Sequence, residues 1–87
     1  MAVQYYEKTK IKSVGTSRGG WTKSEGEGAD AGKTIYTCTT QGATATVNFE
    51  DGTSQGHPPA GAGPIKAGSK IKVGHDMNRV EIEEDTV

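Results

Sequence analysis

Residues 70–83 read KIKVGHDMNRVEIE, and they contain the clearest structural pattern of the chain. Ile71 and Val73 alternate with lysines, and Val80 and Ile82 alternate with charged residues. Alternation with a period of two is typical of a β-strand that buries one face. The stretch therefore predicts two strands of this kind, separated by a turn at residues 74–79.

The two strands fit a single antiparallel register. That register pairs Val73 with Val80, Ile71 with Ile82, Lys72 with Glu81, and Lys70 with Glu83. Both apolar pairs fall on one face and both opposite-charge pairs on the other, and cross-strand pairs of each kind stabilise a sheet. We expect a hairpin whose acidic strand neutralises the lysines of its partner.

The same reasoning predicts further strands upstream. Residues 3–14 form one strand candidate, and residues 34–40 and 43–49 form a hairpin around Gln41-Gly42. This second hairpin would pair Tyr36 with Val47, Cys38 with Ala45, and Thr34 with Phe49. All of these apolar residues then share one face, with Cys38 as a small buried residue. Residues 50–53 contain Asp-Gly and predict a tight turn.

Glycine and proline mark two long loops, at residues 15–33 and 54–64. An acidic tail at residues 84–87 closes the chain. No helical period is sustained anywhere. The chain has 87 residues, 13 of them glycine, and is 31% hydrophobic, so one β domain spanning residues 1–87 with a thin core is expected. The fold class is all-β: a small SH3-like or OB-like barrel, or a short β-sandwich, of five to six strands.

No group of residues carries a recognisable chemistry. The stretch 28–34, GADAGKT, has Glu27 where a phosphate-binding loop needs its first glycine. His57, His75 and Cys38 are too isolated to form a zinc site, and Cys38 has no partner for a disulfide. No serine stands in a nucleophile motif. We expect no enzymatic activity, no metal and no cofactor.

These exclusions favour a structural, assembly or protein-binding module that acts through β-edges and loops. The candidate partner-binding residues are Trp21 in the first long loop, Arg18 beside it, Ile35 as a misfit on the polar face, and Tyr6. Tryptophan is enriched at binding hot spots, although Trp21 could instead fold back as a lid on the core. The partner would be protein, as a homo-oligomer or a larger assembly. In composition the chain looks like small accessory proteins of phage or virus particles.

Two other functions remain open. Lys8, Lys10 and Lys12, together with Tyr6 on the same strand face, could bind nucleic acid or another anion, although the net charge is −1. An inhibitor or host-factor-binding protein could instead contact its target through the Trp21 loop. The start of the chain does not resemble a signal peptide, and no segment has transmembrane length. We expect synthesis in the cytoplasm, incorporation into a particle such as a virion, and no membrane partner.

Overall fold

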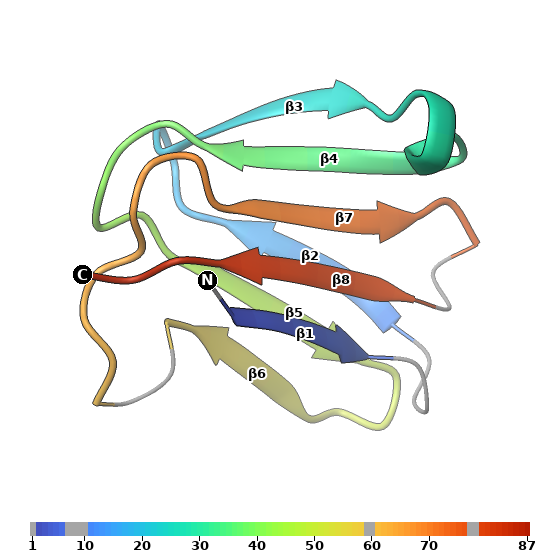
Figure 1. Ribbon diagram of the computed structural model, residues 1–87. Coiled ribbons are helices and arrows are strands. Elements are labelled where there is room, and N and C mark those ends of the chain that lie inside the picture. Colours follow the sequence, from blue (N-terminus) through green and yellow to red (C-terminus); the bar gives the residue numbers. More distant parts are fainter. Residues whose placement is uncertain (1, 7–10, 59–60, 77–78) are drawn as a thin grey trace.

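The computed structural model describes the backbone of residues 2–6 and, with side chains, residues 11–58, 61–76 and 79–87. These residues form eight strands and one 3-10 helix. The elements are β1 (Ala2–Tyr6), β2 (Ile11–Thr16), β3 (Trp21–Glu25), η1 (Gly28–Asp30), β4 (Lys33–Cys38), β5 (Ala45–Phe49), β6 (Ser54–His57), β7 (Lys70–Gly74) and β8 (Val80–Glu84). All pairings are antiparallel, and the predicted all-β class is confirmed (Figure 1).

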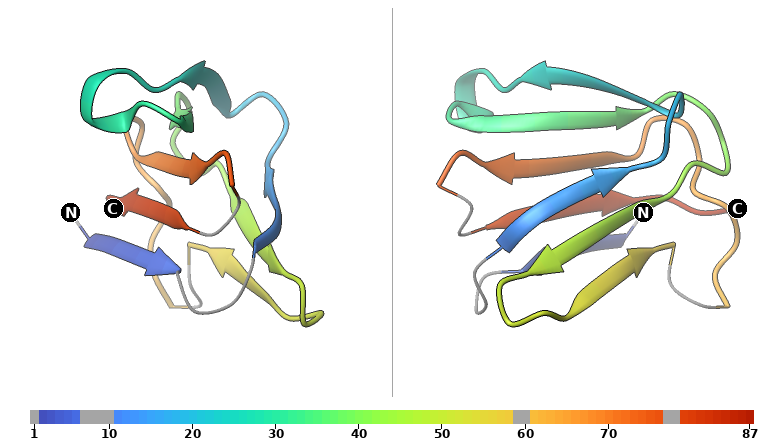
Figure 2. Two further views of the ribbon diagram at one scale, coloured as in Figure 1. Left: turned by 90° about the vertical axis from the view of Figure 1, so that its right-hand side faces the viewer. Right: turned by 180° about the vertical axis from the view of Figure 1, so that it is seen from behind.

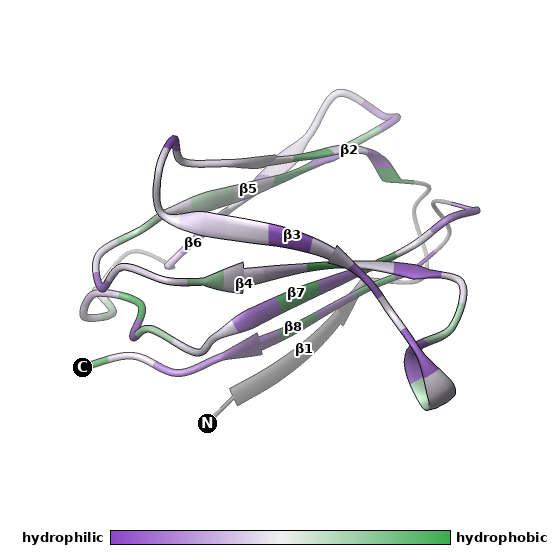
Figure 3. Ribbon diagram, turned by 90° about the horizontal axis from the view of Figure 1, so that it is seen from above, coloured by the Kyte–Doolittle hydropathy of each residue, from purple (hydrophilic) through white to green (hydrophobic). Residues whose placement is uncertain are grey.

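The strands form two sheets with a shared core. One sheet has the order β1-β8-β7-β4-β3, and the other has the order β2-β5-β6. The sheets lie as two layers (Figure 2). Hydrophobic residues recur along β5 and β7 (Figure 3). The buried core draws on both sheets: Ile11, Ala45, Val47, Ile71, Val73, Val80 and Ile82. Face-to-face packing of the alternating apolar positions therefore holds the two layers together.

The β7–β8 hairpin is confirmed in the predicted register. All four pairs of residues stand opposite each other as the sequence predicts. The apolar members Ile71 and Val80 are at most 1% exposed. On the other face, Lys72 Nζ lies 2.9 Å from Glu83 Oε1, on the diagonal of the register. The hairpin therefore contributes apolar side chains to the core from one face and forms an ion pair on the other face.

The single strand predicted for residues 3–14 is wrong. The structure has two strands there, β1 paired with β8 and β2 paired with β5, in different sheets. A straight strand of twelve residues would measure roughly 40 Å, and the longest dimension of the molecule is 31 Å. Within β2 the register shifts between Ile11 and Ser13, which makes Lys12 the extra residue of a β-bulge.

The hairpin predicted for residues 34–49 is also wrong. β4 pairs with β3 and β7, and β5 pairs with β2 and β6, so the segment between them crosses from one sheet to the other. The Gly42 N–H donates to the Ile65 carbonyl, which ties this crossing to a distant segment. Cys38, Ala45 and Val47 are buried as expected. They belong to opposite walls of the core, whereas a hairpin would place them side by side in one sheet.

The two predicted loops contain strands. The segment 15–33 includes the end of β2, all of β3 and η1, and the first residue of β4. The segment 54–64 begins with β6, which pairs with β5 across the confirmed turn at Asp51-Gly52. Apart from Trp21, both strands are polar. They are defined by backbone hydrogen bonds to a neighbouring strand and not by apolar alternation. Sequence periodicity does not detect strands of this kind.

The predicted acidic tail is part of the fold. Glu84 is the last residue of β8 and is 5% exposed. Asp85 accepts a backbone hydrogen bond from Lys66, and Thr86 forms a β-bridge with Ile65. Pairing with the segment around Ile65 therefore orders residues 84–87.

The strand count is eight, where five to six were expected. β2 and β3 belong to separate sheets among the described strands, and closure into an SH3-like or OB-like barrel is not observed. The two strands meet at the turn of residues 17–20 and diverge from it (Figures 1 and 2). This divergence leaves a gap along one side of the fold.

Candidate functional site

Trp21 lies at the start of β3 and closes one end of the core. Its indole N–H donates to the Thr44 carbonyl at 3.0 Å and lies 3.3 Å from Ser17 Oγ. The half-buried ring packs against the main core and against the small cluster of Cys38, Ala43 and Ile65. This position agrees with the interpretation of Trp21 as a lid on the core, and its contact with a partner remains a prediction.

The four candidate partner-binding residues do not form one surface. Arg18 is exposed in the turn that precedes Trp21, so these two are neighbours. Ile35 faces away from the core, half-buried, with Lys72 and Ser24 opposite it on the adjacent strands. Tyr6 ends β1, at the other edge of the same sheet. One binding surface made of all four residues is therefore not observed.

The structure describes only the two ends of the predicted lysine strand face. Lys12 is exposed at the bulge of β2, in the three-stranded sheet, whereas Tyr6 belongs to the five-stranded sheet. Lys8 and Lys10 lie outside the described residues. Tyr6 and Lys12 do not share a strand. The nucleic-acid hypothesis placed base stacking on Tyr6 and a phosphate contact on Lys12 along one strand face, and these two residues do not form such a face.

β3 is an edge strand whose outer side carries backbone hydrogen-bonding groups. The bonds from Thr39 N to Gly20 O and from Gly26 N to Lys33 O, at 2.9 and 2.8 Å, flank its ladder with β4. Hydrogen-bonded positions alternate in an antiparallel ladder. The N–H and C=O groups of Lys23 and Glu25 therefore point away from β4. We call residues Trp21–Glu25 the β3 edge.

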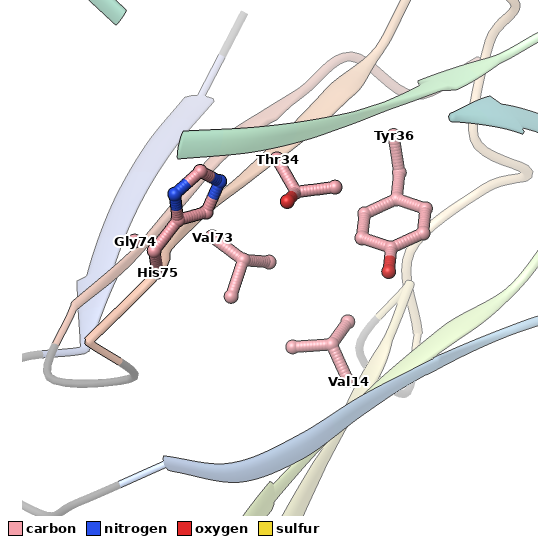
Figure 4. A pocket seen from close by; sticks show the side chains of 6 residues that line it. All are labelled: Val14, Thr34, Tyr36, Val73, Gly74 and His75. Carbon is pink, nitrogen blue, oxygen red and sulfur yellow. The ribbon is translucent and has the colours of Figure 1, made fainter. Parts of the chain in front are cut away.

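A cleft of about 290 Å³ lies in the gap between β2 and β4. Its lining consists of Val14, Thr34, Tyr36, Val73, Gly74 and His75. Thr34 and Tyr36 point from β4 toward Val14 on β2 (Figure 4). Val14 and Tyr36 pack against the core and are partly exposed. The cleft, called here the inter-sheet cleft, thus combines an apolar floor with two hydroxyl groups.

The β3 edge and the inter-sheet cleft adjoin each other. Lys23 stands opposite Tyr36 and Glu25 opposite Thr34 in the β3–β4 register, so these side chains belong to the face that carries the cleft. His75 Nε2 lies 2.9 Å from Glu25 Oε2, and both side chains are exposed. A polypeptide segment that pairs with β3 would therefore also lie beside the cleft.

Charges on the outer face of the five-stranded sheet satisfy one another. Asp30, on η1, lies 3.2 Å from Lys72 and 3.6 Å from Lys33. The hydrogen bond from Lys72 lowers the pKa of Asp30 below its usual value of 3.8. The pKa of Lys72 is raised, chiefly by the hydrogen bond to Glu83. On the outer face this network engages Asp30, Lys33, Lys72, Glu81 and Glu83 with one another.

A histidine and a carboxylate meet inside the fold. His57 on β6 and Glu84 on β8 are 2% and 5% exposed. Their atoms Nδ1 and Oε1 lie 3.4 Å apart. A substrate could not reach groups that are buried to this extent. We therefore regard the pair as a link between the two sheets.

Comparisons of this chain with protein-family models, with curated proteins and with solved structures found no match. Among the described residues, no cluster of three or more histidine, cysteine or acidic side chains could hold a metal ion. The part of the chain that the structure describes also has no helix with the length and apolarity that a membrane crossing requires. The geometry of the β3 edge and the inter-sheet cleft thus carries the functional argument.

A weak signal for this site is present in the sequence. Residues 21–25, WTKSE, stand between Gly20 and Gly26 and include β-prone tryptophan and threonine. Glycines that bound a short segment with such residues indicate a strand. The signal was obscured because Lys23 and Glu25 occupy the positions that an ordinary strand fills with apolar residues.

Proposed function

We propose that this chain is a non-enzymatic protein-binding module that pairs with an extended polypeptide segment along the β3 edge. One observation carries the proposal: outward backbone groups of Lys23 and Glu25 adjoin an open apolar cleft. Strand addition uses these two features together, since backbone hydrogen bonds supply affinity and pockets for alternate side chains supply specificity. The module is a short, open β-sandwich in this proposal.

The bound segment would contribute side chains to two faces. Residues on the inner face would meet Lys23, Glu25 and the inter-sheet cleft, whose floor includes Val14 and Tyr36. An apolar side chain that enters the cleft would cover surface that the chain itself leaves partly exposed. The charged neighbours favour a segment with both an acidic and a basic residue. A structural or assembly role, rather than catalysis, follows from this mode of binding.

Selection of extended peptides from a displayed random library tests the proposal. Nuclear magnetic resonance would locate the selected peptides through amide shift changes, which are expected in β3 and around the inter-sheet cleft. The decisive variant is Lys23→Pro, because proline removes the outward N–H without removing a bond to β4. Losing one such bond should weaken peptide binding about tenfold. The matched control Lys23→Gln removes the same charge and keeps the N–H, so the difference in affinity between the two variants measures the backbone hydrogen bond.

Circular dichroism would verify that Lys23→Pro folds. If it does not fold, Glu25→Pro offers a second outward position with the same logic. The proposal is wrong if selected peptides bind the proline variants as tightly as Lys23→Gln. It is equally wrong if the shift changes map to the outer face around Ile35 instead of β3.

A further inference from the structure

We infer that the segment paired with the β3 edge is the β3 edge of a second copy of this chain, in a two-fold antiparallel dimer. This inference rests on the proposed function and names its partner. It follows from the order of charges along β3, where Lys23 and Glu25 are separated by one residue.

Backbone geometry restricts the possible registers. Outward groups of one copy can bond only to outward groups of the other, so the odd-numbered residues Trp21, Lys23 and Glu25 must face odd-numbered residues. The two-fold axis then passes through a residue position. Each choice of that position fixes which side chains stand opposite each other.

Charge selects one of these registers. An axis at Lys23 sets the two lysines against each other, and an axis at Glu25 does the same for the glutamates. An axis at Thr22 sets each lysine against a half-buried Trp21. An axis at Ser24 sets Lys23 against the partner's Glu25, twice. Like charges directly opposite each other destabilise a sheet and opposite charges stabilise it, so the axis at Ser24 is preferred.

The exposed surroundings of these residues allow the pairing. Lys23 and Glu25 are exposed, and β2 diverges from β3 toward the C-terminal end of β3 (Figure 2). Glu25 contacts His75 through Oε2, which leaves Oε1 for a second cation. A lysine on an edge strand normally discourages pairing. Here Lys23 disfavours the register whose axis passes through Lys23, because two lysines would then face each other. It favours the register whose axis passes through Ser24, because each Lys23 then faces a glutamate.

The dimer would join the two five-stranded sheets edge to edge. Lys23 and Glu25 share the face of the inter-sheet cleft, so both clefts would open on the same face of the joined sheet. Five residues per copy make a small contact, and small interfaces are weak. We therefore expect a dimer that dissociates on dilution.

Sedimentation equilibrium across protein concentrations up to about 1 mM tests the inference, because dimers with micromolar to millimolar dissociation constants populate that range. The wild type should show a monomer–dimer equilibrium. Lys23→Glu replaces two attractive pairs by two repulsive ones and should raise the dissociation constant at least about tenfold. Glu25→Lys should do the same. The exposed control Lys12→Glu carries the same charge change in the other sheet and should leave the dissociation constant unchanged.

Two rescues identify the register. The double variant Lys23→Glu/Glu25→Lys exchanges the charges and should restore the wild-type dissociation constant. An equimolar mixture of the two single variants should form heterodimers, since every opposed pair is then a glutamate with a lysine. A wild type that is monomeric throughout, or a double variant that stays as weak as the singles, overturns the inference.

These outcomes separate the inference from the function on which it rests. If the wild type stays monomeric while selected peptides bind at β3, the dimer is excluded and the edge serves a different protein. If neither dimer nor peptide binding involves β3, the proposed function fails as well.

Discussion

The buried pair of His57 and Glu84 yields a quantitative prediction. Its members come from different sheets, are 2% and 5% exposed, and approach to 3.4 Å. We predict that replacing either one alone, as His57→Leu or Glu84→Met, is strongly destabilising. Replacing both together should cost much less than the sum, because the double variant leaves no ionisable group without its partner.

The geometry sets the magnitude. Unit charges at the 3.4 Å that separates these two atoms would attract by about 5 kcal/mol at an effective dielectric constant of about 20. The removal of both charges from water offsets most of this attraction, so the net contribution of the pair is small. A single replacement loses the attraction and keeps one desolvation penalty, which amounts to about 3–5 kcal/mol. A domain of this length has roughly 4–13 kcal/mol of stability in total.

Urea unfolding followed by tryptophan fluorescence measures these free energies. Trp21 is the sole tryptophan and packs against both apolar clusters, so its emission reports on the core. With a slope of about 1–2 kcal/mol per molar urea, each single variant should lower the unfolding midpoint by about 1.5–5 M. The double-mutant cycle gives the coupling energy directly.

The reasoning is refuted if either single variant loses less than about 1 kcal/mol, a loss typical of an ordinary hydrogen bond. It is also refuted if the double variant loses the sum of the two single losses, because the residues would then act independently. If a single variant fails to fold, a folded double variant still demonstrates the coupling and sets a lower bound on its energy.

Two further predictions concern the turn beside Trp21 and the outer face. A Cβ at Gly20 would lie 2.6 Å from the Ala43 Cβ. Gly20→Ala should therefore lower the free energy of unfolding, measured in urea, by about 1–3 kcal/mol. In the control Gly15→Ala nothing lies within 4 Å of the added atom, so the free energy of unfolding should change by less than about 0.5 kcal/mol. The pKa of Asp30 is lowered by Lys72, so its contribution to stability is present above the ordinary carboxyl value and is lost as the pH falls through the lower folded value. The melting temperature of Asp30→Asn should therefore fall less steeply below about pH 4 than that of the wild type. An equally steep fall in both proteins would contradict this assignment.

Sequence alone predicted the β7–β8 hairpin because its information is local. Apolar and charged pairs agree on one register within residues 70–83, and all four pairs are observed. The error at residues 34–49 has a different origin. Alternation showed correctly that Cys38 and Val47 face the core, but an apolar face does not specify the neighbouring strand. Two strands that face each other across a core have the same pattern as two strands side by side.

The candidate site was less predictable than the core. Burial selects apolar residues and leaves a periodic signal, whereas β3 is held by backbone hydrogen bonds that every residue except proline can make. Tyr36 was predicted as an apolar position of a strand, whereas Val14 was only the last residue of the strand predicted for residues 3–14. Their meeting in one cleft depends on how two sheets diverge, and no local pattern encodes that divergence.

The charges of β3 also explain why the fold stays open beside it. Lys23 and Glu25 occupy positions on the face that carries Tyr36 and Thr34, where a closed barrel would require burial. Pairing β2 directly with β3 would take both charges out of water next to Val14, and burying ions without full compensation costs several kcal/mol each. The same charges remain favourable when the neighbour is a strand that brings an acid and a base in the complementary order. The charges of Lys23 and Glu25 therefore disfavour direct pairing of β2 with β3.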